Sequence, residues 1–444
     1  MESTLIKNAT LVNEGQITVA DVLIEGERIV KIGTQLSAGN ARVIDAEGHY
    51  LLPGIIDDQV HFRDPGLTHK GDLESESRAA IAGGITSYID QPNTVPHAVT
   101  QELLAQKYQN ALGRSYANYS FMMGGTNDNL AEILKTNPRD VAGLKLFLGS
   151  STGDMLVDSS AAIEAIFVAT PLLIAVHCED ETTVKTNLAH YKEQFGEDIP
   201  VHYHPLIRTE EACYLSSSKT VALAKKTGAR LHVFHISTAK ELDLFDNTLP
   251  LEEKKITAEV CIHHLWFSDA DYATRGSLIK WNPAVKTAAD REALWEALND
   301  GRIDVVATDH APHTLEEKSQ VYTKAPSGGP LVQHALIAML EAVQEGKISL
   351  EKVVEKMAHN PAVLFKIEDR GFIREGYYAD LVLVNPKASW TVTKENVLYK
   401  CGWSPMEGTT FHHQVTHTFV NGTLAYEKGT VHPIPAGKRL LFNR

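Results

Sequence analysis

The sequence has few cysteines and no long hydrophobic run, and both absences narrow the class of protein. Four cysteines are scattered over 444 residues, with no C-x-x-C pair. This pattern argues against a disulfide framework and favours a reduced, cytoplasmic protein. No stretch approaches the roughly 18 apolar residues of a membrane-spanning helix. The first residues, MESTLIKNATLVNEG, lack the apolar core of a signal peptide. We therefore expect a soluble protein without a membrane partner.

An excess of positive charge is also missing. The chain carries 42 Lys and Arg against 56 Asp and Glu, which gives a net charge of -14. Proteins that bind nucleic acid usually show a basic footprint, so we expect no nucleic-acid partner. What the chain does have is 43% hydrophobic residues, enough for a large core. These properties fit an enzyme that acts on a small molecule.

Both ends of the chain consist of short, strand-like runs. The first part contains TLIKNATLV, DVLIEGERIVKIG and RVIDAEGHYLLPG, and the last part contains ADLVLVNP and THTFVNGTLAYEKG. Asn, Gly and Glu-Gly turns separate these runs. Each end is too small to fold alone, so we expect the two to pair into one small β-sandwich. The predicted limits are 1–52 and 369–444 for the sandwich, with 53–368 inserted between them.

The central region alternates strand-like and helix-like segments. The strand-like runs are GIIDDQVHF, GITSYIDQPN, YSFMMGGT, AGLKLFLGS, LLIAVHCED, RLHVFHIST, TAEVCIHHL and DVVATDHAPH. Amphipathic stretches such as DLESESRAAIAG, TEEACYLSSSKTVALAKKTG and DREALWEALND lie between them. Eight such strands alternating with helices predict an α/β fold of the (β/α)8 TIM-like barrel type. A doubly wound open sheet competes, but the absence of G-x-G-x-x-G after the first strand weakens its dinucleotide-binding version.

Polar side chains occur where these predicted strands end. In a barrel they would all face the C-terminal rim, where barrel active sites form. In chain order they are His61, Arg63, Asn93, Lys145, His177, His235, His264 and Asp309. One histidine among 20 carries little information, whereas a set on several strand ends predicts a functional site.

Several of these side chains suit a metal centre. His177 and His235 each follow an apolar run, and neutral imidazoles suit zinc or a similar divalent ion. Asp309 suits metal ligation, general-base catalysis or both. Lys145 lies in the apolar run GLKLFLG, where burial should lower its pKa and leave an amine able to take up carbon dioxide as a carbamate. The alternative is a lysine that extends to the rim. Two metals so held could activate water to attack an amide carbon.

A second group of residues suits substrate recognition. Arg63 is suited to a bidentate contact with a carboxylate. Asn93, in QPNTVP, is either a binding residue or an ordinary turn residue, and His313 lies on a loop four residues after Asp309. The Gly-rich loop APSGGP, residues 325–330, either closes over a substrate or forms a plain turn.

The sequence resembles the class I dihydroorotases of the amidohydrolase superfamily. The resemblance covers almost the whole chain and rests on LLPGIIDDQVHFRDPG, QPNT, GLKLFLG, AVHCED, VFHIS, WNPAVK and, above all, ATDHAPHTLEEK. Such enzymes pair a barrel with a small sandwich built from both chain ends. They catalyse the reversible cyclisation of N-carbamoyl-L-aspartate to (S)-dihydroorotate in pyrimidine biosynthesis.

The resemblance also implies roles for individual residues. The implied metal ligands are His61, Lys145, His177, His235 and Asp309. Carboxylated Lys145 would join two sites, with one or two Zn²⁺ ions per chain. A metal-bound hydroxide would attack the cyclic amide, with Asp309 as acid and base. The implied substrate-binding residues are Arg63, Asn93, Asn282, His313, Ser327 and Gly328. A homo-oligomer, such as a dimer, and association with aspartate transcarbamoylase are further implications.

One position departs from the family pattern. The motif D-x-H-x-H is here Asp57-Asp58-Gln59-Val60-His61. A glutamine offers only a neutral amide oxygen, a weaker donor to zinc than imidazole. Three protein ligands and a water molecule would still make a workable site, so we expect weaker binding in that half. Whether Gln59 ligates the metal or only packs and hydrogen-bonds beside it stays open.

Two other functions remain as alternatives. One is another cyclic-amide hydrolase, a dihydropyrimidinase, hydantoinase or allantoinase, whose substrate rings lack the carboxylate. The other is a non-catalytic homologue that acts as a scaffold, a hypothesis motivated by Gln59. Two stretches, EQFGEDIPVHYHPLIRTEEA and KCGWSPMEGTTF, are without an assigned role. In the first, His202, His204 and Arg208 could orient metal ligands.

Overall fold

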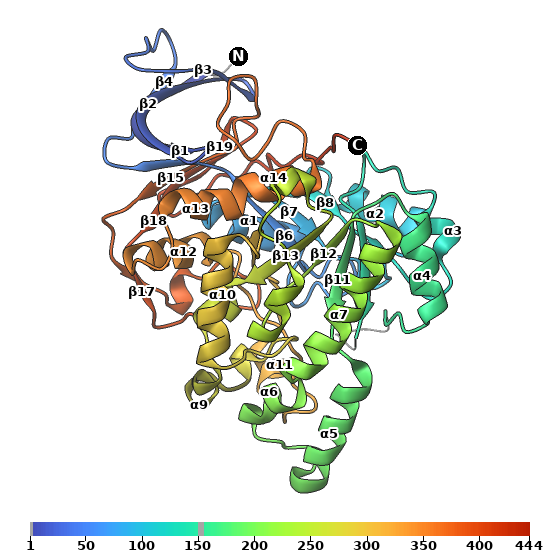
Figure 1. Cartoon of the computed structure of the whole chain (residues 1–444). Helices are drawn as coiled ribbons and strands as arrows, with labels where there is room; N and C mark the ends of the chain where they lie inside the picture. The colour runs from blue at the N-terminus through green and yellow to red at the C-terminus, as the bar shows by residue number, and fades with distance from the viewer. Residues whose placement is uncertain (1–2, 150–154) are drawn as a thin grey trace.

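The centre of the chain is a closed barrel of parallel strands (Figure 1). The computed structural model describes residues 3–149 and 155–444, so Ser150, the last residue of a predicted strand, lies outside the described residues. One sheet contains β6 (Ile55–Val60), β7 (Ile85–Asp90) and β8 (Asn118–Phe121). A second contains β9 (Met123–Gly124), β10 (Leu144–Leu148), β11 (Ile174–Cys178), β12 (Leu231–Val233), β13 (Ile256–Cys261) and β14 (Val305–Ala307). Because β8 and β9 are successive parts of one strand position, the described residues contribute eight positions. The predicted barrel is confirmed.

A buried carboxyl group helps to close this barrel. A parallel bridge joins Val60, at the end of β6, to His310, beyond the end of β14. Beside it, the Thr308 hydroxyl and amide donate to Asp57 at 2.5 and 3.2 Å. Burial raises the pKa of Asp57 well above its ordinary value. A buried carboxyl group needs such partners, and here the partners come from the opposite end of the strand order. Asp57 therefore links the first strand to the last.

Helices follow most of the strands and surround the barrel. The predicted helices are α1 (Leu73–Ala82), α7 (Glu210–Thr227) and α10 (Ala288–Asp300), and each begins after a side-chain cap at Asp72, Thr209 or Thr287. The others are α2 (Gln101–Ala111), α3 (Leu130–Ile133), α4 (Ser160–Ala169), α5 (Glu181–Phe195), α6 (His204–Ile207), α8 (Ile262–Trp266), α9 (Tyr272–Arg275), α11 (Leu315–Lys318), α12 (Ala335–Gln344), α13 (Leu350–Val354) and α14 (Asn360–Phe365). No helix in the described part of the chain is long and apolar enough to cross a membrane.

One predicted strand end is wrong. The run TAEVCIHHL was expected to be a strand throughout, with His264 at its rim. Strand β13 instead ends at Cys261, and His264 lies in α8. The helical turn buries Leu265, whose carbonyl oxygen accepts a hydrogen bond from the Trp295 indole at 3.1 Å. Packing against α10 therefore decides the conformation of a segment whose apolar run continues the strand pattern.

The two chain ends form one curled sheet beside the barrel. Its order is β20-β19-β18-β15-β5-β1-β2-β3, and β4 also pairs with β1. The N-terminal strands are β1 (Ser3–Asn13), β2 (Gln16–Glu25), β3 (Arg28–Gly33), β4 (Arg42–Asp45) and β5 (Tyr50–Pro53). The C-terminal strands are β15 (Leu381–Asn385), β18 (Gln414–Val420), β19 (Thr423–Glu427) and β20 (Thr430–Val431). A separate pair is formed by β16 (Trp390–Thr391) and β17 (Thr410–Phe411).

This sheet has a small apolar core to which both chain ends contribute. Ile6, Val22 and Ile24 come from the first end, and Leu381 and Phe419 come from the last. Antiparallel pairing of β5 with β15 joins the two ends directly. In Figure 1 the strands β2, β3 and β4 arch away from the barrel at the upper left. The predicted β-sandwich domain built from both chain ends is confirmed.

Candidate active site

A pocket lies at the C-terminal ends of the barrel strands. Nine of the predicted site residues line it: Gln59, His61, Lys145, His177, His235, Asn282, Asp309, Ser327 and Gly328. Phe147, Trp281 and Ala311 complete the lining. The barrel therefore brings together side chains that are up to 269 residues apart in the sequence, as expected from their positions at strand ends.

The other three predicted site residues do not line the pocket but lie next to it. Nε2 of His313 lies 3.1 Å from the carbonyl oxygen of Ser327, which does line it. Oδ1 of Asn93 lies 2.7 Å from Nδ1 of His61. Arg63 donates from Nε to the Pro312 carbonyl at 3.1 Å, and its Nη2 lies 3.0 Å from Nε2 of His313. Burial lowers the pKa of Arg63 to about 10, so the guanidinium stays charged at neutral pH. Burial and then the Arg63 charge lower the pKa of His313 well below its ordinary value.

The first pair of histidines, His177 and His235, presents donors that fit a cation. Nδ1 of His177 lies 3.0 Å from Nε2 of His235. Burial lowers the pKa of both imidazoles, so both are neutral near pH 7. Nδ1 of His235 and Nζ of Lys145 lack a hydrogen-bond partner among the described residues. Buried polar atoms without a partner are uncommon and point to an absent ligand. Two neutral imidazoles side by side match the ligands that zinc prefers.

Lys145 lies deep beside this pair. Its side chain is fully buried, and Nζ lies 4.0 Å from the centre of the Phe234 ring. Burial lowers the pKa of Lys145 to about 7. The lysine is therefore buried within the barrel, and the alternative in which it extends to solvent is not what the structure shows. Its amine is therefore placed inside the pocket beside the two imidazoles.

A carboxylate that the sequence reading missed supports His177 from behind. Oε2 of Glu179 lies 3.0 Å from Nε2 of His177, and the same oxygen pairs with Arg208. Burial alone would raise the pKa of Glu179, but Arg208 and His177 outweigh it and lower the pKa to about 2. An anion on the second nitrogen of an imidazole fixes the orientation of the ring. The run AVHCED, which places a carboxylate two residues after His177, was the available signal.

The segment between α5 and α7 supplies this arginine and a second contact. Arg208, considered above as an orienting residue, holds Glu179. Nε2 of His204 lies 2.6 Å from the Trp281 carbonyl, and its Nδ1 lies 2.7 Å from the Tyr322 hydroxyl. His202 stacks on the neighbouring Tyr203 instead. The stretch EQFGEDIPVHYHPLIRTEEA therefore braces two sides of the pocket.

The second pair, His61 and Asp309, is arranged differently. Nε2 of His61 lies 3.1 Å from Oδ1 of Asp309. Gln59 donates from Nε2 to the same oxygen at 3.4 Å, and its Oε1 lies 3.7 Å from Sγ of Cys261. This orientation is chemically consistent, because the amide N–H meets a carboxylate. The reverse orientation would place two acceptors face to face.

Backbone conformation also marks the pocket. Arg63, His235 and Asp309 have φ angles of 69°, 43° and 46°, in the left-handed region. Residues other than glycine adopt this region at a cost of about 1–3 kcal/mol, and such residues cluster at functional sites. The Trp281 indole, which donates to the Asp309 carbonyl at 3.3 Å, helps to hold one of them. Three of the ten non-glycine residues with positive φ in the described part of the chain are thus predicted site residues.

The Gly-rich loop is more than a plain turn. Gly328 has a φ of +126°, and a Cβ there would lie 2.6 Å from the Ala311 carbonyl oxygen. A Cβ on Gly329 would lie 2.7 Å from the Trp281 ring. Only glycine fits at such close approaches. The backbone of Ser327 and Gly328 can therefore lie directly against the pocket.

Two buried lysines that the sequence reading missed hold this loop in place. Lys280 donates to the carbonyls of Tyr322 and Ala325 at 2.7 and 2.5 Å. Lys318 donates to the carbonyls of Pro326 and Gly328 at 2.9 and 2.8 Å. Burial lowers the pKa of Lys280 to about 7 and that of Lys318 well below its ordinary value. The loop is thus anchored by its carbonyl groups.

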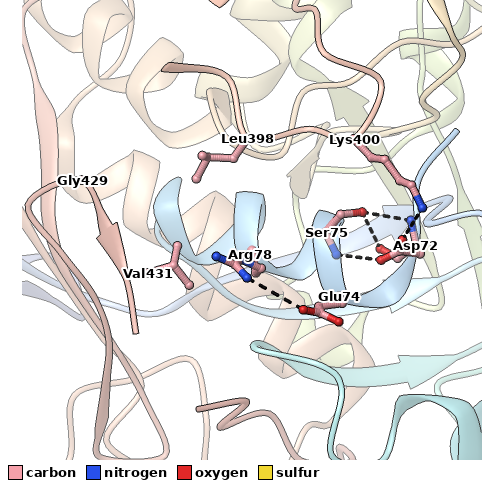
Figure 2. Close-up of a pocket in the computed structure, with 8 residues that line it drawn as sticks. All are labelled: Asp72, Glu74, Ser75, Arg78, Leu398, Lys400, Gly429 and Val431. Carbon is pink, nitrogen blue, oxygen red and sulfur yellow. Dashed lines mark hydrogen bonds and ion pairs between the residues drawn. The ribbon is translucent and has the colours of Figure 1, made fainter. Parts of the chain in front are cut away.

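The stretch KCGWSPMEGTTF packs behind the rim. The Trp403 indole donates to the His313 carbonyl at 2.7 Å, and the Lys400 amide donates to Glu76 at 3.1 Å. Figure 2 shows a surface hollow between this stretch and α1, where Lys400 pairs with Asp72 and Arg78 lies 3.8 Å from Glu74. The described lining of the hollow contains none of the predicted site residues. Its charges pair with one another, and the stretch supports the loop that carries His313.

Below the pocket, three buried side chains form a second group with metal-ligand chemistry. Asp58, His232 and Glu259 place their ligand atoms within 4.8 Å of one another. The Thr257 hydroxyl donates its hydrogen to the Leu231 carbonyl, so it accepts from Nδ1 of His232 at 2.8 Å. Nε2 then faces Asp58 at 3.1 Å and Glu259 at 3.8 Å. A cation must lie between them, either a metal ion or a proton.

The proton suffices for charge balance in this group. Burial opposes protonation of His232, but the bonds to Asp58 and Glu259 outweigh it and raise the pKa of His232 to about 9. Burial, and then the Asp58 charge, raise the pKa of Glu259 to about 7. An imidazolium between two carboxyl groups therefore balances the charge of this group, although Oδ1 of Asp58 and Oε2 of Glu259 have no hydrogen-bond partner among the described residues.

Comparison with known proteins agrees with this geometry. The model of the Amidohydrolase family matches residues 50–425. A dihydroorotase of Halobacterium salinarum is 37% identical over 418 residues, covering 93% of this chain and 94% of that protein. A dihydroorotase of Carboxydothermus hydrogenoformans is 34% identical over 431 residues, covering 96% and 98%.

Solved structures give the same overall fold. The L-hydantoinase (dihydropyrimidinase) from Arthrobacter aurescens superposes with a TM-score of 0.93 at 28% identity, covering 99% of this chain and 100% of that one. The dihydropyrimidinase from Brevibacillus agri superposes with a TM-score of 0.90 at 27% identity, covering 100% of both chains. The barrel, the sandwich and the sequence matches lead to one conclusion. The chain belongs to the amidohydrolase family and is a metal-dependent cyclic amidohydrolase.

Proposed function

We propose that this chain is a dihydroorotase, which interconverts N-carbamoyl-L-aspartate and (S)-dihydroorotate. The observation that carries the proposal is the buried guanidinium of Arg63 beside His313 at the edge of the pocket. A fixed arginine suits a carboxylate, and dihydroorotate has a carboxylate that hydantoin and dihydropyrimidine rings lack. The identities of 37% and 34% to proteins named dihydroorotase support the same choice.

The pocket residues whose donor atoms would suit a metal are His61, Lys145, His177, His235 and Asp309. Zinc suits the imidazole nitrogens best. The neutral Lys145 amine would add carbon dioxide through a new N–C bond and release one proton, which leaves an anionic carbamate. When bound, the metal supplies Lewis acidity and lowers the pKa of a water molecule.

The protein's own groups would orient the substrate and move the proton. Arg63, Asn93 and His313 hold the substrate carboxylate, while Asn282 and the backbone of Ser327 and Gly328 line the ring. Asp309 takes a proton from the attacking water at Oδ1 and passes it to the departing ring nitrogen. His61 and Gln59, at 3.1 and 3.4 Å from that oxygen, fix its position. Cyclisation uses the same groups in reverse.

Neutral rings remain the second candidate substrate, because the solved structures cited above are hydantoinases and dihydropyrimidinases. The test compares hydrolysis of dihydroorotate, hydantoin and dihydrouracil by the zinc-loaded chain, before and after the change Arg63→Ala. Loss of a hydrogen-bonded charge pair worth about 1.5–3 kcal/mol should lower kcat/KM for dihydroorotate by roughly 10- to 100-fold. Turnover of the neutral rings should stay within a few-fold.

The outcomes separate the three functions. Preference for a neutral ring, unaffected by Arg63→Ala, would replace dihydroorotase with hydantoinase or dihydropyrimidinase. No turnover of any ring by folded, metal-loaded protein would favour the non-catalytic scaffold.

A further inference from the structure

We infer that this chain holds a single metal ion tightly, at His177 and His235, and that Gln59 keeps the His61–Asp309 pair from holding a second one. The inference rests on the proposed metal-dependent function. It goes further by giving Gln59 a definite role, that of a residue positioning Asp309, and by fixing the number of ions.

Both ends of the Gln59 amide contact buried protein groups. Nε2 donates to Oδ1 of Asp309 at 3.4 Å. Oε1, the atom that would have to ligate a metal, lies 3.7 Å from Sγ of Cys261. The side chain is only 2% exposed, so it has little room to turn. If it turned, its oxygen would face the Asp309 carboxylate, which also offers only acceptor atoms.

A chain of contacts holds this amide from below. Sγ of Cys261 also lies 3.3 Å from Oε1 of Glu259, which accepts from the His235 amide at 3.0 Å. Glu259 in turn belongs to the buried cluster with His232 and Asp58. Gln59 therefore belongs to a network of contacts that extends from the pocket into the barrel core.

The two halves of the pocket thus offer opposite environments to a cation. Next to His177 and His235 lie nitrogen atoms without partners, including Nζ of Lys145. The facing atoms lie equally close in both pairs, at 3.0 Å for His177 and His235 and at 3.1 Å for His61 and Asp309. What distinguishes the second pair is the amide N–H of Gln59, which points at Oδ1 of Asp309. An N–H dipole presents its positive end, which repels a cation where a third ligand would be needed.

The experiment counts ions in the full-length protein after loading with excess Mn²⁺ or Zn²⁺ and removing the unbound metal by gel filtration. We expect one equivalent per chain and an electron paramagnetic resonance spectrum of isolated Mn²⁺. His61→Ala should keep that equivalent, and His177→Ala should lose it. Gln59→His should raise the content toward two equivalents and give an exchange-coupled spectrum. Gln59→Glu, which is isosteric, serves the same purpose if the histidine variant does not fold.

Three results would overturn the inference. The first is two tightly held ions with exchange coupling in the unmodified chain. The second is loss of the ion in His61→Ala but not in His177→Ala. The third is loss of an ion in Asp58→Asn alone, which would place the metal in the buried cluster of Asp58, His232 and Glu259. Because ions are counted without any substrate, one bound ion with no turnover of dihydroorotate would reject the proposed function and leave the inference standing.

Discussion

The two halves of the pocket contain similar residues but differ in how the surrounding protein treats them. His177 and His235 come from neighbouring strands, and nitrogen atoms beside them lack partners among the described residues. His61 and Asp309 come from the strands that close the barrel, and Oδ1 of Asp309 accepts a hydrogen bond from the Gln59 amide. Ligand chemistry alone would rate the halves as equal. The difference shows that the availability of a donor depends on what else it can bond to.

The two halves also differ in the side chain that contacts the second ring nitrogen of a histidine. His177 is backed by a buried anion, Glu179, which Arg208 holds in place. His61 is backed by Asn93, a neutral amide whose oxygen lies 2.7 Å from Nδ1. A charged partner raises the basicity of an imidazole more than a neutral one does. This difference also favours the first half as the metal site that we infer.

The largest expected effect compares the two halves directly. His177→Ala should lower kcat/KM for dihydroorotate by more than the roughly 100-fold typical of losing a residue that only supports a ligand. His61→Ala should cost less, because it removes a partner of Asp309 and leaves the metal bound. Activity and metal content of the two variants, measured side by side, check this. Equal loss of metal in both would erase the distinction between the halves.

The next effect concerns the support of His177. Arg208→Gln would leave the buried Glu179 carboxylate without its cation, so we expect metal affinity to fall roughly 10- to 100-fold. Competition with a chelator measures the affinity. Arg302→Gln is the matched control, because that arginine pairs with Asp300 in an exposed turn. Unchanged affinity in a folded Arg208 variant would show that the ion pair is structural only.

A smaller effect is expected for a substitution that changes no residue in either half of the pocket. Trp403→Phe keeps an aromatic ring but removes the 2.7 Å hydrogen bond to the His313 carbonyl. Loss of one such bond costs about 1 kcal/mol, so KM for dihydroorotate should rise roughly five-fold. Metal content should not change. A Trp403→Phe enzyme that loses metal would mean that the substrate side and the metal side are not separable.

The smallest effect concerns the anchor of Gln59. Cys261→Ala removes the donor that faces Oε1 of Gln59, whereas Cys261→Ser keeps one. We expect Cys261→Ala to change the free energy of unfolding by about 1 kcal/mol and kcat by no more than a few-fold. Denaturant unfolding and steady-state kinetics provide the comparison. A serine variant that behaves like the alanine variant would remove Cys261 from the positioning of Gln59.

Much of this site could be predicted from the sequence because the pattern that marks each residue lies within a few positions of it. An apolar run that ends in a polar residue is visible without a structure, and six of the seven predicted strands with such an end carry it to the rim or beside it. The exception is TAEVCIHHL, since nothing in its pattern distinguishes a longer strand from a strand followed by α8. Tertiary packing of Leu265 and Trp295 settled that choice.

Other features could not be predicted from the sequence because they depend on contacts with residues far away in the chain. The orientation of Gln59 depends on Cys261 and Asp309, which are 202 and 250 residues distant. The anchoring of the Gly-rich loop depends on Lys280, which is 45 residues from the carbonyl it binds at Ala325. Sequence patterns of period 2 and 3.6 carry no information about such pairs.

The sequence by itself determined the class of the fold and the identity of the donors. Alternating apolar runs and amphipathic stretches specify a barrel, and the residues at the strand ends specify imidazole, carboxylate and amine groups at one rim. Only the tertiary structure decided which of those groups are free to bind a cation. The reason is that each buried polar atom seeks a partner, and the partner is set by the close packing of distant segments.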